Sequence, residues 1–319
     1  MTGASITLSA DFGGSRIKLG LVRNGIVLAR EAIEARSHDG LASQLPRIAS
    51  MFEVMRERLG AERAEFGAVS IGFPSVMDPV SGRILTAFGK YGDAPGIDLP
   101  KWARATLGLD LTIEHDVRAA LVGEWRAGAG KGFDDIVMVT LGTGLGSAVL
   151  MDGLLVRGAH GQGGILGGHL TVRLGGRLCT CGNRGCAEAE ASTMVLPEII
   201  RARPEFPSGR LRGLEPLDYQ GVFRLAREGD AGAAAVRERS IEVWAAMIVN
   251  LVHAHDPECV IVGGGILSGA ADFLPDLERA VRALAHTPWG IVRIIPARLG
   301  DDAALIGCDV LAREKFPTS

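Results

Sequence analysis

The sequence predicts a protein of the α/β class that is built from two related lobes. Apolar stretches with strand-like and helix-like spacing alternate along its 319 residues, which is typical of sheets with flanking helices. A unit of strand, glycine-rich turn and strand occurs around residue 11 and again around residue 142. At roughly 100 to 200 residues per domain, the length allows two lobes with a large core.

The first half begins with this unit. Apolar runs at 5–10 and 17–22 predict strands on either side of the turn Asp11-Phe12-Gly13-Gly14-Ser15. Asn24-Gly25 is a hairpin signal and predicts a third strand. The remaining expected elements are a helix over 40–59, a strand over 66–73, a helix near 99–107, a strand over 109–114 and a helix over 117–127.

The second half repeats the opening in outline. A strand over 136–141, the turn 142–146 and a returning strand over 147–151 come before a hairpin turn at Asp152-Gly153. Then follow helices over 221–228 and 232–255, a buried strand over 259–262, a helix near 271–285, a strand over 291–295 and a final helix over 303–315.

Composition and charge exclude several classes of protein. Glycine accounts for 44 residues, roughly twice its average share, but shows no collagen period. A net charge of −3 provides no overall basic field for nucleic acid. No stretch reaches the ~18 uninterrupted apolar residues that a membrane span needs, and no basic segment opens the chain as in a secretory signal. We therefore expect a cytoplasmic protein without nucleic-acid or membrane partners.

The two glycine turns predict a phosphate-binding function. Successive N–H groups in a tight turn bind anions, and glycine lets a phosphate approach closely. The first turn adds Asp11, whose carboxylate can hold Mg²⁺ through water, and Ser15, whose hydroxyl can bond a phosphate oxygen. The second adds Thr143. One such turn alone is more often only a hairpin, but two that each carry a hydroxyl favour phosphate binding.

Two competing nucleotide motifs do not match. Gly130-Lys131-Gly132 lacks the Ser or Thr that a P-loop places after its lysine. Gly263-Gly264-Gly265 and the residues that follow do not give G-x-G-x-x-G in register. A dinucleotide-binding dehydrogenase is therefore poorly supported.

These motifs resemble the ROK family of sugar kinases and sugar-responsive repressors over nearly the whole chain. Asp11 to Ser15 looks like the family's D-x-G-G-T phosphate turn, and 141–146 looks like its second phosphate turn. The segment 261–265 looks like its adenosine segment. The resemblance implies a two-lobed actin-like ATPase fold, related to ribonuclease H, in which each lobe is a mixed sheet with flanking helices. The ATP-binding residues it implies are Asp11, Gly13, Gly14, Ser15, Gly142, Thr143, Gly144, Gly263, Gly264 and Gly265.

A histidine and three cysteines predict a zinc site. His169, Cys179, Cys181 and Cys186 form the pattern H-x9-C-x-C-x4-C. One imidazole and three thiolates complete a tetrahedral Zn²⁺ site with no open position, which is the structural kind. A dithiol redox pair or chance clustering is the alternative, but C-x-C spacing is strained for a disulfide. The spacing matches the ROK pattern, in which the zinc holds a loop that carries sugar contacts.

Asp116 is the candidate catalytic base. It lies where a strand ends and a helix begins, and taken alone it would be interpreted as a helix cap. The ROK pattern places an Asn-Asp pair at this strand end, and its Asp takes a proton from the sugar hydroxyl. The segment 119–124 matches the helix that follows.

The sugar-binding residues depart from the family pattern. His115 stands where the family has Asn, and the Glu expected before His169 is absent from 162–168, a segment one residue longer than usual. The loop 87–95 lacks the family's usual sequence motif and contains Lys90 and Tyr91 instead. The substrate-binding residues that the resemblance implies here are His115, Asp116, His169 and Glu188.

These departures argue against assuming glucose. A changed contact in a buried sugar site can leave a hydroxyl unpaired. The sequence is therefore compatible with an N-acylated or epimeric sugar, or with a less polar acceptor. His160 is either a sugar contact or an ordinary loop residue.

Two functions follow from the resemblance. The first is an ATP-dependent carbohydrate kinase with Mg²⁺ and structural zinc, acting on a hexose or N-acylhexosamine. The second is a non-catalytic or sugar-sensing ROK protein with an altered pocket. A DNA-binding repressor is not expected, because the ten residues before Asp11 cannot hold a helix-turn-helix. The family implies a homodimer.

We expect the lobes to divide at Val117 and Arg118. The smaller lobe would comprise residues 1–117 and a C-terminal helix over 302–319, with the first phosphate turn and Asp116. The larger lobe, residues 118–301, would hold the second phosphate turn, the zinc loop and the adenosine segment.

Overall fold

The computed structural model describes residues 5–78, 81–87, 89–206 and 208–317. The chain divides into two compact units. Unit 1 comprises Met1–Gly132, Leu155–Gly163 and Ala297–Ser319, and unit 2 comprises Phe133–Leu154 and Gly164–Pro296. Each unit contains one five-stranded sheet with helices beside it, which confirms the α/β class. The lobe boundaries expected from the sequence stay a prediction.

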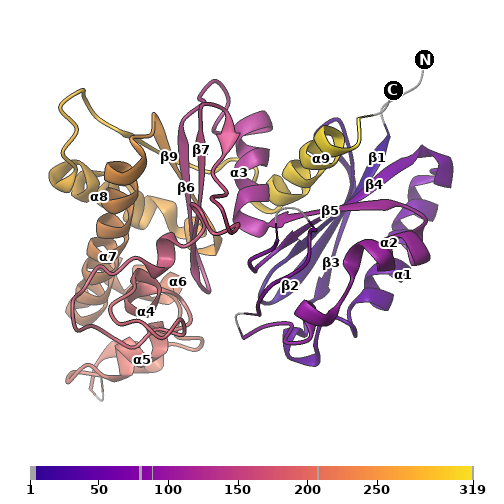
Figure 1. The fold of residues 1–319 in the computed structure, drawn as a ribbon. Coiled ribbons are helices and arrows are strands. Elements are labelled where there is room, and N and C mark those ends of the chain that lie inside the picture. Colours follow the sequence, from indigo (N-terminus) through magenta and orange to yellow (C-terminus); the bar gives the residue numbers. More distant parts are fainter. Residues whose placement is uncertain (1–4, 79–80, 88, 207, 318–319) are drawn as a thin grey trace. The chain divides into compact units, whose positions relative to one another are not determined.

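The sheet of unit 1 is mixed (Figure 1). Its strand order is β3 (Ile26–Glu34), β2 (Arg16–Arg23), β1 (Ile6–Phe12), β4 (Phe66–Phe73) and β5 (Asp110–His115). The strands β1, β2 and β3 form an antiparallel meander, whereas β4 and β5 run parallel to β1. The carboxyl ends of β1, β4 and β5 therefore meet at one edge of the sheet.

One face of this sheet carries the larger core. Alternate residues of β1 (Ile6, Leu8, Ala10 and Phe12) point to this face, as the period of two in a strand requires. They pack with α1 (Leu45–Leu59) and α2 (Leu99–Leu107), which lie on the same side in Figure 1. Asp98 caps α2 by accepting the N–H of Lys101 at 3.0 Å.

The opposite face is covered by α9 (Ala303–Lys315) together with α3 (Asp116–Ala127). These helices approach so closely that a Cβ on Gly307 would lie 1.7 Å from the carbonyl oxygen of Ala119. On α9, the buried carboxylate of Asp309 accepts hydrogen bonds from the Thr7 hydroxyl and the Gly25 N–H, both at 2.8 Å. The C-terminal helix is thus bonded to the first strand of the chain.

Unit 2 repeats the mixed arrangement. Its strand order is β10 (Arg293–Pro296), β9 (Cys259–Gly263), β6 (Ile136–Leu141), β7 (Leu145–Met151) and β8 (Leu154–Leu155). The pair β6 and β7 is antiparallel, and β9 is parallel to β6. The long helix α7 (Ala231–His255) packs with α6 (Tyr219–Arg227), α8 (Ala270–Leu284) and β6.

The order of the strands and long helices agrees with the sequence analysis. The helix expected over 40–59 begins only at Leu45, because residues 41–44 form turns whose first N–H groups bond the Asp93 carboxylate. Two short helices were not expected, α4 (Ala187–Ala191) and α5 (Leu196–Arg201). Short 3-10 turns occur at Ser37–Asp39, Arg63–Glu65, Ala94–Gly96, Gly167–His169, Arg210–Gly213, Gly265–Gly269 and Gly300–Asp302.

Within the part of the chain that the structure describes, every helix is too short or too polar to cross a membrane.

The close packing of α3 and α9 predicts that a side chain added at Gly307 destabilises the protein. Gly307→Ala is expected to lower the free energy of unfolding by about 1–3 kcal/mol, because its methyl group would overlap the Ala119 carbonyl. Gly96→Ala serves as the control in unit 1, since nothing lies within 4 Å of its added Cβ, and should change the free energy by less than about 0.5 kcal/mol. Denaturant unfolding measures both. Helix propensity alone would make Gly307→Ala stabilising, and that outcome would contradict the packing argument.

Candidate functional site

Two predicted site residues of unit 1, Asp11 and Asp116, lie close to Gly72 at the carboxyl edge of its sheet. Asp11 ends β1 opposite Gly72 of β4, and Asp116 follows β5 as the first residue of α3. A Cβ on Gly72 would lie 3.4 Å from Cα of Asp116 and 3.7 Å from Oδ1 of Asp11. A side chain at position 72 would therefore contact both aspartates, and glycine leaves this space open.

The Asp11 carboxylate is buried and forms an ion pair with Lys18. Lys18 lies opposite it in the β1–β2 register, with Nζ 3.2 Å from Oδ2 of Asp11 and 3.0 Å from Oδ1 of Asp301. Burial raises the pKa of Asp11 to about 6; Lys18 opposes this increase and Asp116 adds to it. The carboxylate is therefore in an environment that favours an additional cation.

The first glycine turn joins β1 to β2 by a tight reversal. The Gly13 N–H donates to the carbonyl of Arg16 at 3.0 Å. Within the described residues, the N–H groups of Gly14 and Ser15 have no protein acceptor. Two donors of this turn are thus free for an anion.

His115 and Asp116 contact each other at the start of α3. Nδ1 of His115 lies 3.0 Å from Oδ1 of Asp116, and the Val117 N–H donates to the same oxygen at 2.7 Å. Burial lowers the pKa of His115, so its ring is neutral at pH 7. The Val117 N–H also donates to Nδ1 of His115 at 3.3 Å, so one backbone donor positions both the Asp116 carboxylate and the ring.

An ion cluster around the buried Glu114, which the sequence analysis missed, supports this strand end. Glu114 accepts hydrogen bonds from Arg118 at 3.2 Å and from Arg157 at 2.7 and 3.0 Å. These two arginines lower the pKa of Glu114 against the effect of burial. Arg118 also donates to the carbonyls of Gly161 and Gly163, which fixes the segment that carries His160.

In unit 2 the second glycine turn and the triple glycine lie side by side. Gly142, Thr143 and Gly144 connect β6 to β7, and the Gly142 N–H donates to the Gly144 carbonyl at 3.1 Å. Gly264, with φ +93°, follows the adjacent strand β9, and a Cβ on it would lie 2.3 Å from the Leu141 carbonyl. The structure thus brings together the two unit 2 segments that were predicted to bind nucleotide.

Glu188 contacts the same turn from α4. Its Oε2 accepts the Leu145 N–H at 3.0 Å. On the other side of Leu145, a Cβ on Gly168 would lie 1.8 Å from the Leu145 carbonyl. In the segment that lacks the expected Glu, the side chain of Ile165 is buried. The segment therefore packs its glycines against β7 and places an apolar side chain inward.

His169, Cys179, Cys181 and Cys186 form a cluster that could hold one metal ion. Their candidate ligand atoms all lie within 4.8 Å of one another. Nδ1 of His169 is 3.5 Å from Sγ of Cys179, and the thiols of Cys181 and Cys186 are 3.7 Å apart. His169 was also predicted to contact the substrate, and Nδ1 is the nitrogen it directs to this cluster.

Tight backbone turns hold the cluster together. The Cys179 N–H donates to the Asn183 carbonyl at 2.8 Å, and the Gly182 N–H donates back to the Cys179 carbonyl at 2.9 Å. Gly185 has φ +72°, and a Cβ there would lie 1.6 Å from the Arg173 carbonyl. The glycines of this motif are therefore required by the curvature of the loop.

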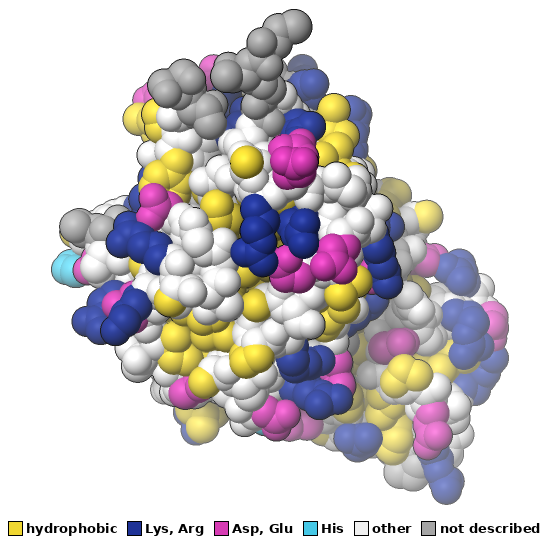
Figure 2. Space-filling model, turned by 90° about the vertical axis from the view of Figure 1, so that its right-hand side faces the viewer, with side chains coloured by type: hydrophobic (Ala, Val, Ile, Leu, Met, Phe, Trp, Pro, Cys, Tyr) yellow, Lys and Arg dark blue, Asp and Glu magenta, His cyan; other side chains and the backbone are white. Residues whose placement is uncertain are grey.

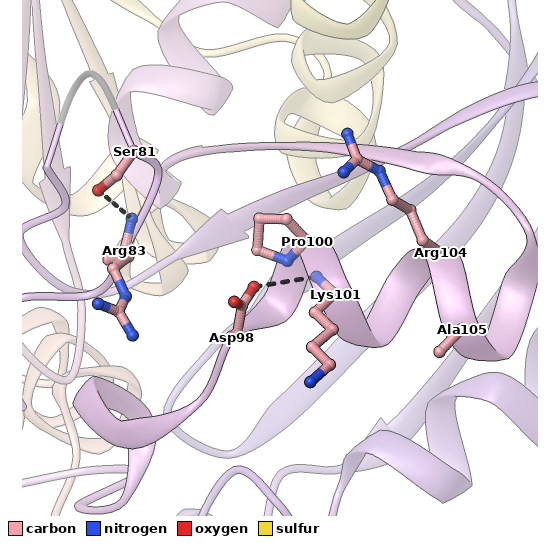
Figure 3. Close-up of a pocket in the computed structure, with 7 residues that line it drawn as sticks. All are labelled: Ser81, Arg83, Asp98, Pro100, Lys101, Arg104 and Ala105. Carbon is pink, nitrogen blue, oxygen red and sulfur yellow. Dashed lines mark hydrogen bonds between the residues drawn. The ribbon is translucent and has the colours of Figure 1, made fainter.

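A pocket of about 760 Å³ in unit 1 contains none of the predicted site residues. Figure 3 shows its polar lining, in which the Ser81 hydroxyl accepts the Arg83 N–H and the Asp98 carboxylate accepts the Lys101 N–H. On the face of the molecule in Figure 2, basic and acidic side chains are interspersed. Exposed ion pairs such as that of Arg63 with Glu53, at 2.7 Å, join opposite charges.

Comparisons with known proteins agree on one family. The model of the ROK family matches residues 7–315. A glucokinase of Thermotoga maritima is 32% identical over 318 residues, covering 97% of this chain and 98% of the relative. An N-acetylmannosamine kinase of Haemophilus influenzae is 28% identical and covers 94% of this chain and 93% of the relative.

A solved structure extends the match to the fold. The ROK glucokinase of Streptomyces griseus, crystallised with glucose and AMPPNP, has a TM-score of 0.82 and 29% identity, covering 97% of this chain and all of that chain. This similarity confirms the actin-like ATPase fold that the sequence motifs implied.

The His/Cys cluster predicts a measurable metal content. The purified protein is expected to contain one metal ion per chain, and Cys181→Ser is expected to lose most of it because a ligand is removed. Cys259→Ala removes a buried cysteine of β9 and should retain the metal. Elemental analysis of the three proteins measures this. Equal metal content in wild type and Cys181→Ser would contradict the assignment.

Proposed function

The chain belongs to the ROK family, and on that premise we propose that it is an ATP-dependent carbohydrate kinase. It would transfer the γ-phosphoryl group of Mg-ATP to a hydroxyl of a sugar. The observation that carries the proposal is the pairing of Asp11 and Asp116 across Gly72, next to a turn with free N–H donors. The relatives named as glucokinase and N-acetylmannosamine kinase support the same reaction class.

In the proposed reaction, Asp116 is the general base. The sugar hydroxyl oxygen forms a bond to the γ-phosphorus while the bond from that phosphorus to the bridging oxygen of ADP breaks. The hydroxyl proton passes to the Asp116 carboxylate. Because phosphoryl transfer needs mainly positioning and charge neutralisation, one base and a well-lined phosphate site are sufficient.

Asp11 is the proposed residue for Mg²⁺. Its buried carboxylate, with a pKa raised to about 6, fits a divalent cation, because such an ion would favour the charged form. One carboxylate that acts through water is also the usual way in which proteins hold Mg²⁺ on a nucleotide. When bound, the ion neutralises charge on the phosphates.

We assign the phosphates of ATP to the two glycine turns. The proposed phosphate contacts are Gly13, Gly14 and Ser15 of the first turn and Gly142, Thr143 and Gly144 of the second. The adenosine would lie at Gly263, Gly264 and Gly265, which follow the strand beside the second turn. The hydrogen-bond donors of both turns and the hydroxyls of Ser15 and Thr143 support this assignment.

The proposed sugar contacts are His115, Asp116, His169 and Glu188. His115 offers a neutral imidazole where the family pattern has an Asn amide, and Ile165 is buried in the segment where a Glu is expected. A site with these changes would not form all the hydrogen bonds to glucose hydroxyls that the family pattern implies. We therefore propose a hexose or N-acylhexosamine as the substrate class.

The metal of the His/Cys cluster is proposed to be structural zinc. Zn–S bonds of about 2.3 Å and a Zn–N bond of about 2.0 Å in a tetrahedron place the ligand atoms roughly 3.5 to 3.8 Å apart. The distances of 3.5 and 3.7 Å in the cluster fit these values. With four protein ligands there is no open position for catalysis.

A non-catalytic, sugar-sensing ROK protein is the alternative, and the changes at His115 and in 162–168 are what favour it. The homodimer and the cytoplasmic location expected from the sequence stay predictions. The two functions are separated by measuring ADP release with Mg-ATP over hexoses, N-acetylated hexosamines and polyols. Sugar binding without ADP release from any acceptor would establish the alternative.

Asp116→Asn is expected to lower ATP-dependent sugar phosphorylation by at least about 10²-fold, as loss of a general base does. Sugar affinity should change little, because the amide keeps the shape of the side chain. Turnover numbers from ADP release and sugar affinity from calorimetry measure the two effects. Substantial turnover in the variant would refute the assignment of the base.

His115→Asn is expected to change the preference among sugars, because an amide offers a donor and an acceptor in a different geometry from an imidazole. The measurement is kcat/KM over the same panel of acceptors for both proteins. Identical rank order and ratios would mean that this position does not select the substrate.

A further inference from the structure

Lys90 lies directly over the first glycine turn. A Cβ on Gly14 would be 2.9 Å from its Nζ and 3.3 Å from its Cε. Both residues belong to unit 1. The ammonium group is therefore next to the N–H groups of Gly14 and Ser15, which have no protein acceptor in the described residues.

The residue after Lys90 fixes its position. Tyr91 is fully buried, and its ring packs against Phe12 and Phe73 with centroids 5.6 and 5.3 Å away. Its hydroxyl lies 3.4 Å from the Gly13 carbonyl, to which it donates, and its N–H donates to the Ser37 carbonyl at 2.9 Å. The loop is thus anchored in the core beside the turn.

This anchoring maintains an unfavourable backbone conformation. Tyr91 has φ +52°, a region that costs a bulky residue about 1 kcal/mol or more and is concentrated at functional sites. Two residues later, the Asp93 carboxylate accepts the N–H groups of Leu41 and Ala42 at 2.5 and 2.9 Å. Contacts on two sides therefore hold the strained turn that directs Lys90 over Gly14.

Within the described residues, the charge of Lys90 is not balanced by an ion pair. Among residues 5–78, 81–87, 89–206 and 208–317, no carboxylate forms an ion pair with Lys90. The other lysine of this edge, Lys18, differs because it is paired with both Asp11 and Asp301. An unpaired ammonium beside free backbone donors is a site for an anion.

We propose that Lys90 is a further catalytic residue, which binds the γ-phosphoryl group of ATP over Gly14. This inference rests on the proposed kinase function. The ammonium group of Lys90 forms no covalent bond and neutralises charge on the equatorial oxygens as the phosphoryl group moves to the sugar hydroxyl. It would supply at the first turn a positive charge that the turn's own sequence, Gly13-Gly14-Ser15, lacks.

The test compares Lys90→Met with Lys90→Arg and with a matched control, Lys101→Met, which removes a solvent-exposed lysine of α2 in the same unit. With Mg²⁺ present, Lys90→Met is expected to weaken binding of AMPPNP at least tenfold and binding of ADP less than twofold, because only AMPPNP has the third phosphoryl group. Lys90→Met should also lower kcat by about 10²-fold. Lys90→Arg should restore part of the nucleotide affinity and part of kcat. Lys101→Met should match wild type in both measurements. Thermal unfolding of all four proteins should occur at the same temperature.

Three outcomes would overturn the proposal: unchanged binding of both nucleotides, equal weakening of both, or a raised KM for the sugar with unchanged AMPPNP binding. The nucleotide comparison needs no turnover. If wild type releases no ADP with any sugar, the proposed function fails, while the ratio of AMPPNP to ADP affinities still decides the role of Lys90.

Discussion

The parallel register of β1, β4 and β5 is the constraint on which the rest of unit 1 depends. It sets Asp11 opposite Gly72 and Gly72 opposite Glu114, so that the residues following β5 emerge beside the end of β1. A shift by one residue would turn Asp11 to the other face of the sheet, into the core that holds Phe12. The sheet thus determines the distance between two carboxylates that are 105 positions apart in the sequence.

Small residues make this arrangement possible. Gly72 leaves open the space between Asp11 and Asp116, while Gly123 and Gly307 let α3 and α9 approach with a backbone carbonyl in place of a side chain. In unit 2, Gly264 and Gly168 lie against the backbone of Leu141 and Leu145 in the same way. Close backbone approaches therefore explain part of the glycine excess, and 18 glycines of the described residues have a positive φ.

Features that depend on residues close together in the chain could be predicted from the sequence. The glycine turns, the His/Cys cluster and the order of the long elements could be predicted because each depends on neighbouring residues. The interactions of Arg118 with Gly161 and Gly163 could not, since tertiary packing alone brings them together. Lys18 could have been found by counting across the β1–β2 hairpin. The position of Lys90 depends on the positive φ of Tyr91, for which a tyrosine gives no signal.

The bond between Thr7 on β1 and Asp309 on α9 joins residues 302 positions apart, and this separation has a consequence for biosynthesis. At roughly 5–20 residues per second, the ribosome would need on the order of 15 to 60 s to make the helix that covers one face of the first sheet. During that time the residues of unit 2, which lie between the segments of unit 1, are already complete. Unit 2 can therefore fold during translation. The sheet of unit 1, although it is synthesised first, is covered by its C-terminal helix only at the end of synthesis.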